Sequence, residues 1–254
     1  MTLSHLRLYH KAMTRAGVIV PDETSVLCEG CGYTLDGLPP SGQCPECGLP
    51  IAASTGADGR VLPAWEDPQN HAGPVRRFLQ TTVEVVFHTG RFYRTLATRR
   101  DNRAAFTFAK VHWAISAILL AAALSIHVDF FQSFILHNSW LLFALLAPTT
   151  YCFIWGTTAL AARLSAWEAA YRGLRLPTAV VLRALYYHAA HFLPVALVAF
   201  ATVTLNRLII RLHPAFAEQS VRYLLFLCVE VVAAAGYLFK TYWTGMRNTM
   251  YANH

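Results

Sequence analysis

The sequence has little acid and almost no lysine. Only 14 of its 254 residues are Asp or Glu, and 18 of its 21 basic residues are arginine. Charge is missing altogether from several long apolar runs, in a chain that is 55% apolar. A soluble helical bundle needs polar faces to cover its core. These runs have almost none, which excludes an ordinary soluble helical protein.

Common signatures of catalysis and export are also missing. There is no phosphate-binding glycine loop, no GxSxG and no HExxH. The first 20 residues lack the continuous apolar run of a cleavable signal, so segment 1–20 is expected to be a tail or a short helix. Of the eleven histidines, only His188 and His191 share a helical face. We favour interfacial histidines over the start of a metal site, and we expect no enzyme.

Four of the apolar runs predict transmembrane helices. The expected spans are about 104–128, 139–162, 184–206 and 221–243. Each is long enough for a helix to cross a hydrocarbon layer of about 30 Å. The predicted fold is therefore mainly α, with a four-helix transmembrane bundle over 104–243 and a C-terminal tail over 244–254.

Arginines set the expected orientation of these spans. Seven arginines lie between Arg76 and Arg103, before the first span, and four lie between the second and third spans. The connection 129–138 carries no Lys or Arg. The positive-inside rule then places both termini in the cytoplasm.

Four cysteines near the front of the chain form the clearest motif. Two Cys-x-x-Cys-Gly knuckles provide Cys28, Cys31, Cys44 and Cys47 within segment 21–50. Two thiolate pairs at this spacing supply the four soft ligands of a closed tetrahedral metal site. Such a site is stable where thiols stay reduced, which agrees with a cytoplasmic position.

Zinc is the expected metal, in a structural role. The knuckles also look like those of rubredoxin, an iron protein, but that family has a much longer connection with aromatic residues around the metal. Here Tyr33 is the one aromatic residue in the connection, so iron is less favoured. A module of this size cannot build a core alone, so the metal would supply most of its folding free energy.

The charge of the cysteine segment argues against nucleic acid as a partner. Between Pro21 and Arg60 there are six acids and one base, a net charge of −5. Phosphate binding needs Lys and Arg on the contacting face. We therefore expect this segment to contact a protein partner or to be purely structural.

Two further segments link the cysteines to the first span. Segment 51–74 is rich in Pro, Gly and Ala and is predicted to be a tether, in which Trp65 is either docked on the ribbon or at the membrane interface, or has no role. Segment 75–103 is predicted to be one amphipathic basic helix, with Phe78, Val85, Phe92 and Leu96 on a single stripe. Such a helix suits the headgroup region of a lipid bilayer, although packing on the bundle is nearly as good an interpretation.

Two family resemblances follow from these motifs. The pattern CxxCGYxLxGLP followed by CPECG, over residues 26–50, resembles the cytoplasmic zinc-ribbon heads of many bacterial membrane proteins. The membrane part is loosely similar to the Yip family of multi-pass proteins, through Arg91–Leu96 and the loop Tyr171–Val195. These resemblances imply a bacterial inner-membrane location and a membrane-organising role without catalysis.

Three residues inside the spans remain. Cys152 and Cys228 are expected to be inert apolar fillers. Glu230 is expected to be protonated or hydrogen-bonded, with Thr202 and the Tyr151 hydroxyl as its best-matched donors. The function expected from the whole sequence is an interaction or membrane-organising protein of the inner membrane. The alternative is a small transporter or channel-like protein that uses polar residues within the bundle.

Overall fold

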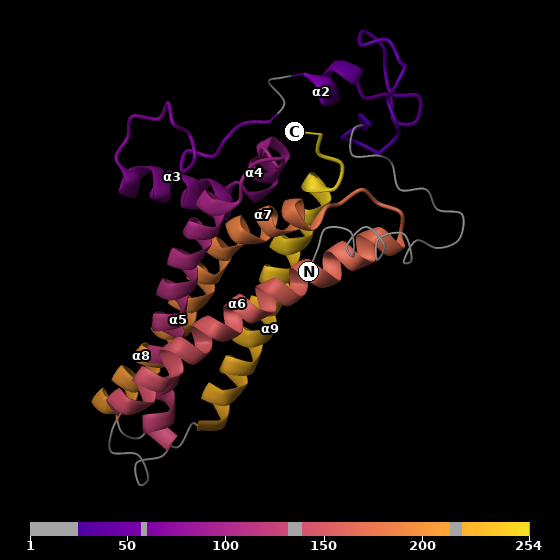
Figure 1. The fold of residues 1–254 in the computed structure, drawn as a ribbon. Helices are drawn as coiled ribbons and strands as arrows, with labels where there is room; N and C mark the ends of the chain where they lie inside the picture. The colour runs from indigo at the N-terminus through magenta and orange to yellow at the C-terminus, as the bar shows by residue number, and fades with distance from the viewer. Residues whose placement is uncertain (1–24, 57–59, 132–138, 214–219, 254) are drawn as a thin grey trace, which may run out of the picture. The chain divides into compact units, whose positions relative to one another are not determined.

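The structure, a computed structural model, describes residues 25–56, 60–131, 139–213 and 220–253. It is mainly helical, with 71% helix and no strand in the described ranges. The chain divides into two compact units. Figure 1 shows the helices that belong to them. Unit 1 contains residues up to Phe106, Ala159–Tyr187 and Trp243–His254, and unit 2 contains Thr107–Thr158 and His188–Tyr242.

Four helices are long and apolar enough to cross a membrane, which confirms the predicted fold class. The helices are α5 (Arg103–Phe131), α6 (Ser139–Tyr171), α8 (Phe192–Leu212), which continues the segment from Thr178, and α9 (Ser220–Thr249). Helix α5 has 29 residues, a length of about 44 Å at 1.5 Å per residue. The helices therefore extend beyond the predicted spans.

The outer surfaces of these helices are apolar. Large side chains such as Phe153, Phe226 and Val232 are 58% to 71% exposed. Within unit 2, an edge-to-face contact between Trp113 and Tyr151 joins α5 to α6, with ring centroids 6.3 Å apart. Apolar exposure on this scale suits helices whose solvent is the hydrocarbon of a bilayer.

The third span is divided by a short turn. Helix α7 (Thr178–His188) passes through the 3-10 turn η1 (Ala189–His191) into α8. The cause is Pro194, which has no amide hydrogen and whose ring crowds the carbonyl of Ala190 in a regular α-helix. The predicted start of this span at residue 184 therefore lies inside α7.

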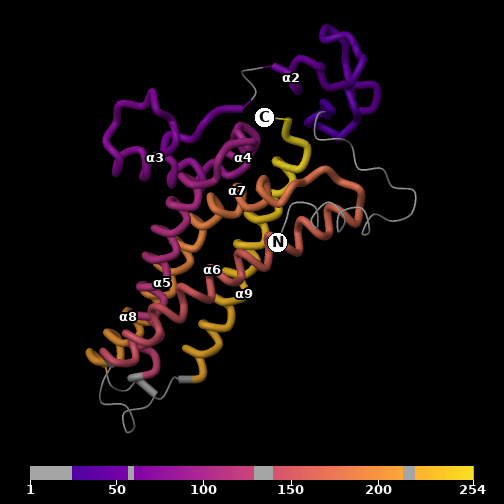
Figure 2. The backbone as a smooth tube through the Cα atoms, in the orientation of Figure 1, coloured from indigo at the N-terminus to yellow at the C-terminus, as the bar shows by residue number. Residues whose placement is uncertain are grey.

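In unit 1, the cysteine segment is a small irregular module that ends in α2 (Ile51–Thr55). Figure 2 follows the chain of residues 25–56 as it folds back on itself. Isolated bridges pair Leu27 with Thr34 and Gln43 with Pro50. The buried interior consists of Cys28, Leu35, Cys44 and Ile51, with Leu27 also buried.

The predicted tether is only partly a free linker. Val61 pairs with Leu96, and the Trp65 indole donates a hydrogen bond to the Ala104 carbonyl at 2.9 Å. Trp65 also packs edge-to-face on Phe78, with ring centroids 5.7 Å apart. Residues 60–66 are therefore a strap fixed to the rest of unit 1. The sequence predicted a tether because the segment is rich in Pro, Gly and Ala.

The predicted single helix over 75–103 is interrupted. The structure has α3 (Pro74–Phe87) and α4 (Thr89–Thr95), and residues Leu96–Asn102 are not helical. His88 has φ −123° between the two helices. The break directs Phe92 and Tyr93 into the core of unit 1, where both are buried. Burial of these aromatic rings offsets the lost helical hydrogen bonds.

Candidate metal centre and the contacts around it

The two cysteine knuckles repeat the same backbone fold. In each, the first cysteine amide donates to the carbonyl five residues later, and the glycine four residues later donates back to that cysteine's carbonyl. The bonds join Cys28 with Tyr33 and Gly32, and Cys44 with Leu49 and Gly48, at 2.8 to 2.9 Å. Gly32 and Gly48 have φ of +83° and +72°, which L side chains rarely adopt. The glycine after each second cysteine is thus required by the turn.

These turns bring the four thiols of Cys28, Cys31, Cys44 and Cys47 together. All four sulfurs lie within 4.8 Å of one another. Two of the sulfur pairs join opposite knuckles: Cys28 Sγ to Cys47 Sγ is 3.5 Å, and Cys31 Sγ to Cys44 Sγ is 3.6 Å. Four sulfurs at about 2.3 Å from a tetrahedral zinc ion are about 3.8 Å apart. The donor set and its spacing therefore fit a tetrahedral metal ion.

The pKa values of the Cys31 and Cys44 thiols, which face each other across the two knuckles, are shifted in opposite directions. Desolvation raises the pKa of Cys31 to about 12. Desolvation acts in the same direction on Cys44, but hydrogen bonds from the Cys47 and Glu46 amides outweigh it and lower the pKa of Cys44 to about 7. One thiol therefore ionises readily near neutral pH, and a bound cation would displace the proton of its neighbour.

Arg60 connects the first knuckle to distant parts of unit 1. Its Nε donates to the Glu29 carboxylate at 3.0 Å, in an ion pair whose side chains are 3% and 18% exposed. Its Nη1 and Nη2 donate to the carbonyls of Leu96 and Asn248, both at 3.0 Å. The single guanidinium thus joins the cysteine module, the strap and the end of α9. A planar group with several donors is suited to this role.

Asn253 makes a second connection to the same module. Its side-chain amide donates to the carbonyls of Leu27 at 2.7 Å and Ser54 at 2.9 Å. Its Oδ1 accepts the Leu27 amide hydrogen at 2.9 Å, and its own backbone amide donates to the Glu29 carboxylate at 3.1 Å. The full hydrogen-bonding capacity of this side chain is used to hold the module against the segment after α9.

Two further contacts close the same interface. The Arg175 guanidinium, buried in the connection between α6 and α7, donates to the Ser25 carbonyl and to Asn253 Oδ1. A Cβ added at Gly32 would lie 2.5 Å from the Tyr251 ring. The back of the first knuckle is therefore packed directly on the C-terminal segment, and its glycine is needed for this contact as well as for the turn.

A buried ion pair supports the strap of unit 1. Arg183 Nη2 donates to Glu66 Oε2 at 2.5 Å, and the two side chains are 0% and 7% exposed. The Tyr187 hydroxyl donates to the other Glu66 oxygen, and Arg183 also donates to the carbonyls of Ala97 and Asp101. Because all these groups are partnered, the desolvation of the charges is offset.

Unit 2 contains a row of polar side chains on one face of α9. Tyr223, Glu230, Tyr237 and Thr241 are spaced by seven or four residues, which places them on the same face of a helix. The Tyr237 hydroxyl lies 2.7 Å from His191 Nδ1, and Thr241 Oγ1 lies 3.0 Å from His188 Nε2. The Tyr223 hydroxyl lies 3.0 Å from His127 Nδ1. One face of α9 thus makes polar contacts with three histidines of this unit.

Three buried polar atoms in this part of unit 2 have no hydrogen-bond partner among the described residues. They are Ser116 Oγ, His191 Nε2 and Glu230 Oε2. The donors predicted for Glu230, Thr202 and Tyr151, are not found at this oxygen. His188 and His191 are buried against α9, whereas the sequence predicted them at headgroup level. Three residues per turn in η1 place the two rings on one face, with centroids 5.1 Å apart.

The two remaining cysteines belong to unit 2. Cys152 and Cys228 are exposed on the surface of unit 2, where a bilayer would cover them. They were predicted to be apolar fillers, and their position shows that they fill no core. Neither is close enough to another described thiol to form a disulfide.

Comparison with protein families, with curated proteins and with solved structures finds no match. The fold and the site define the class: a membrane-helix bundle with a four-cysteine cluster that can hold a metal ion. The resemblances to zinc-ribbon heads and to the Yip family stay predictions.

Proposed function

We propose that this chain is an integral membrane interaction or membrane-organising protein without catalytic activity. One observation carries this proposal: the cysteine module is joined to the end of α9 and to the α6–α7 connection through Arg60, Asn253 and Arg175. A metal that stabilises the module would therefore also hold the membrane-proximal ends of the helices. We call this assembly in unit 1 the head.

Zinc is the metal that we propose for this head. Four thiolates in a closed set suit a structural zinc site. Cys31 and Cys47 lie at the solvent side, and Tyr33, the aromatic residue nearest in sequence, is 39% exposed. An iron centre used for electron transfer is usually shielded by apolar residues on all sides. Here Cys28 and Cys44 pack with Leu35 and Ile51, but Cys31 and Cys47 are exposed. The metal would stabilise the module, and the surface around it would make the contacts with a partner.

The proposed location is a bacterial inner membrane with both termini in the cytoplasm. Four spans return the chain to the side from which it started, and Asn253 hydrogen-bonds Leu27 from the other end of the chain. These two observations support a common side for both ends. The arginine distribution and the four reduced thiols favour the cytoplasm as that side.

The partner that we propose is a protein with a basic contact surface. Glu46 and Asp36 are exposed on the cysteine module, and its described residues 25–56 contain no Lys or Arg. A metal held by four thiolates adds further negative charge. This face would repel nucleic acid and attract Lys and Arg on a protein.

Affinity isolation from solubilised membranes tests this proposal. We expect the full chain to retain its partners when Cys152 and Cys228 are replaced by serine. The paired substitution Cys44→Ser and Cys47→Ser in the full chain should lose them, because the head loses its metal. Equal partner sets for the two variants would contradict an interaction role for the head.

Transport is the second candidate function, favoured by the polar face of α9. Buried polar atoms without partners usually mark an unseen water or ion. Here Ser116, His191 and Glu230 each have such an atom within the bundle. A hydrated path for protons or small cations along α9 would use these groups.

Replacement of Glu230 by glutamine separates the two functions. We expect Glu230→Gln to leave assembly and partner capture nearly intact, since it keeps the hydrogen-bonding shape and removes only the charge. Glu230→Leu should weaken the bundle if an unseen water or ion is bound at Glu230 Oε2, because that water or ion would lose its ligand. The measurements are thermal unfolding and ion flux in proteoliposomes. Flux through the wild-type protein that disappears in folded Glu230→Gln would overturn the interaction role in favour of transport.

A further inference from the structure

Helix α3 has an apolar face that nothing in the described chain covers. Val75, Leu79, Val83 and Phe87 recur every four residues and are 49% to 74% exposed. They form a continuous stripe along one side of a 14-residue helix. We call these four residues the outer stripe.

The outer stripe is different from the stripe that faces the core. Thr81, Thr82 and Val85 are buried, and Phe78 packs on Trp65. The predicted apolar stripe, which included Phe78 and Val85, is thus the inner face of α3. Since the inner face already attaches the helix to unit 1, the outer stripe needs another environment.

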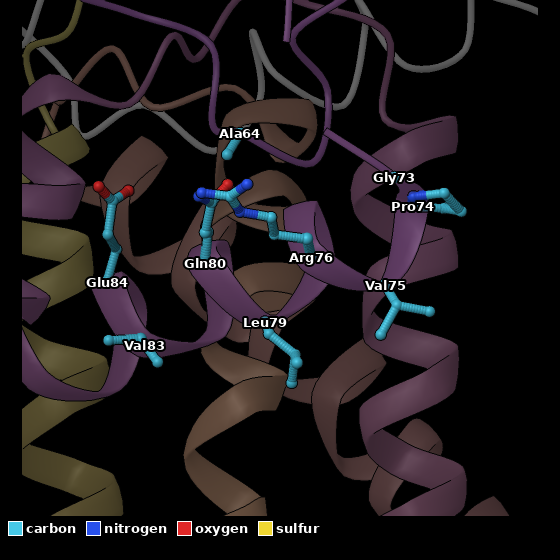
Figure 3. Close-up of a pocket in the computed structure, with 9 residues that line it drawn as sticks. All are labelled: Ala64, Gly73, Pro74, Val75, Arg76, Leu79, Gln80, Val83 and Glu84. Atoms are coloured by element: carbon cyan, nitrogen blue, oxygen red, sulfur yellow. The ribbon is translucent and has the colours of Figure 1, made fainter. Parts of the chain in front are cut away.

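Polar side chains border the outer stripe on its other side. Figure 3 shows Arg76, Gln80 and Glu84 pointing away from Val75, Leu79 and Val83. All six residues line one groove of about 930 Å³. Arg91 and Arg94 on the following helix α4 are exposed as well. The surface of α3 thus combines an apolar stripe with a polar side that carries Arg76 and Glu84, and α4 adds two exposed arginines.

The attachment of α3 indicates what covers this surface. Trp65 packs on Phe78 of α3 and donates to the carbonyl of Ala104, in the first turn of α5. Only residues 96–102 separate α4 from the start of α5. Helix α3 is therefore fixed beside the first turn of the helix that carries the first candidate span.

We propose that α3 lies in the plane of the membrane surface, with the outer stripe among the acyl chains and Arg76, Arg91 and Arg94 among anionic phospholipid phosphates. Aliphatic and aromatic side chains on one side and arginine on the other suit this position. The proposal is independent of whether the head captures a partner or the bundle carries ions.

Site-directed spin labelling of the full chain in liposomes of phosphatidylglycerol and phosphatidylcholine tests this placement. The background carries Cys152→Ala and Cys228→Ala, with metal on the other four cysteines. Single labels are placed at Leu79→Cys and Val83→Cys, with Gln80→Cys and Glu84→Cys as matched controls on the same helix. The ratio of collision rates with oxygen and with a water-soluble nickel chelate should be at least several-fold higher at Leu79 and Val83 than at the controls.

Other results would overturn the proposal. Water-like ratios at all four positions would place α3 away from the bilayer. Labels at Leu79 and Val83 that are shielded from both reagents would indicate a protein, such as a second copy, on the outer stripe. The role of the three arginines is tested by the triple substitution Arg76→Gln, Arg91→Gln and Arg94→Gln, which should lower the ratio at Val83 in anionic but not in neutral liposomes. An equal effect in both would contradict phosphate recognition.

Discussion

Serine in place of Cys44 is expected to unfold the cysteine module within the full-length protein. The buried interior of the module holds few apolar side chains, among them Leu27, Leu35 and Ile51. By contrast, structural zinc sites supply about 10–16 kcal/mol of apparent folding free energy. Serine cannot provide a thiolate, so most of this contribution should be lost. Bound zinc should fall from one ion per chain to nearly none.

Limited proteolysis and metal analysis of purified protein measure this effect. New cleavage is expected between Cys28 and Gly48, and also near Asn253, whose hydrogen bonds need a folded module. The protein with Cys152→Ser and Cys228→Ser should show the wild-type pattern and zinc content. A Cys44→Ser variant that keeps both zinc and protease resistance would refute the metal centre.

The buried pair of Glu66 and Arg183 is expected to give the second large effect. Removal of one partner of a buried ion pair costs about 3–5 kcal/mol, because the other charge remains buried and uncompensated. Glu66→Leu would remove the carboxylate that accepts from Arg183 Nη2 and from the Tyr187 hydroxyl. Arg183 would keep only its neutral acceptors, the carbonyls of Ala97 and Asp101. The free energy of unfolding should fall by that amount, as measured by thermal or detergent-induced unfolding.

A double-mutant cycle makes this expectation specific. The double variant Glu66→Leu, Arg183→Met should lose less stability than the sum of the two single variants, because no lone charge remains. Glu168→Gln serves as the matched control, since its pair with Arg172 is 66% and 49% exposed. Exposed pairs of this kind contribute about 0.5 kcal/mol or less. If Glu66→Leu costs no more than Glu168→Gln, the buried pair does not stabilise the head.

The sequence predicted those features that depend on local pattern. The four spans follow from apolar runs of sufficient length, and the cysteine cluster follows from two knuckles of fixed spacing. The contacts of Arg60 and Asn253 could not be predicted in this way. Asn253 meets Leu27 across 226 residues, and no short motif encodes such a pairing. The sequence offered one indication that Arg60 pairs with a nearby carboxylate, since it is the single basic residue in an acidic segment.

Helix α3 shows a different limit of sequence analysis. Apolar residues occur on two of its sides, at Phe78 and Val85 and again at Val75, Leu79 and Val83. Periodicity alone cannot decide which side meets protein and which meets another environment. Trp65 decides it in the structure by packing on Phe78. Likewise, the position of His188 and His191 depends on the turn before Pro194 and not on their spacing alone.

The bond between Leu27 and Asn253 also determines the order in which the protein can be assembled during its synthesis. All four candidate spans lie between these two residues in the chain. All the residues of the cysteine cluster leave the ribosome early, but the contacts of the module to Asn253 must wait until the last candidate span has been translated. Closure of the head is therefore a late event in biogenesis, because it requires a chain in which all four candidate spans have been made.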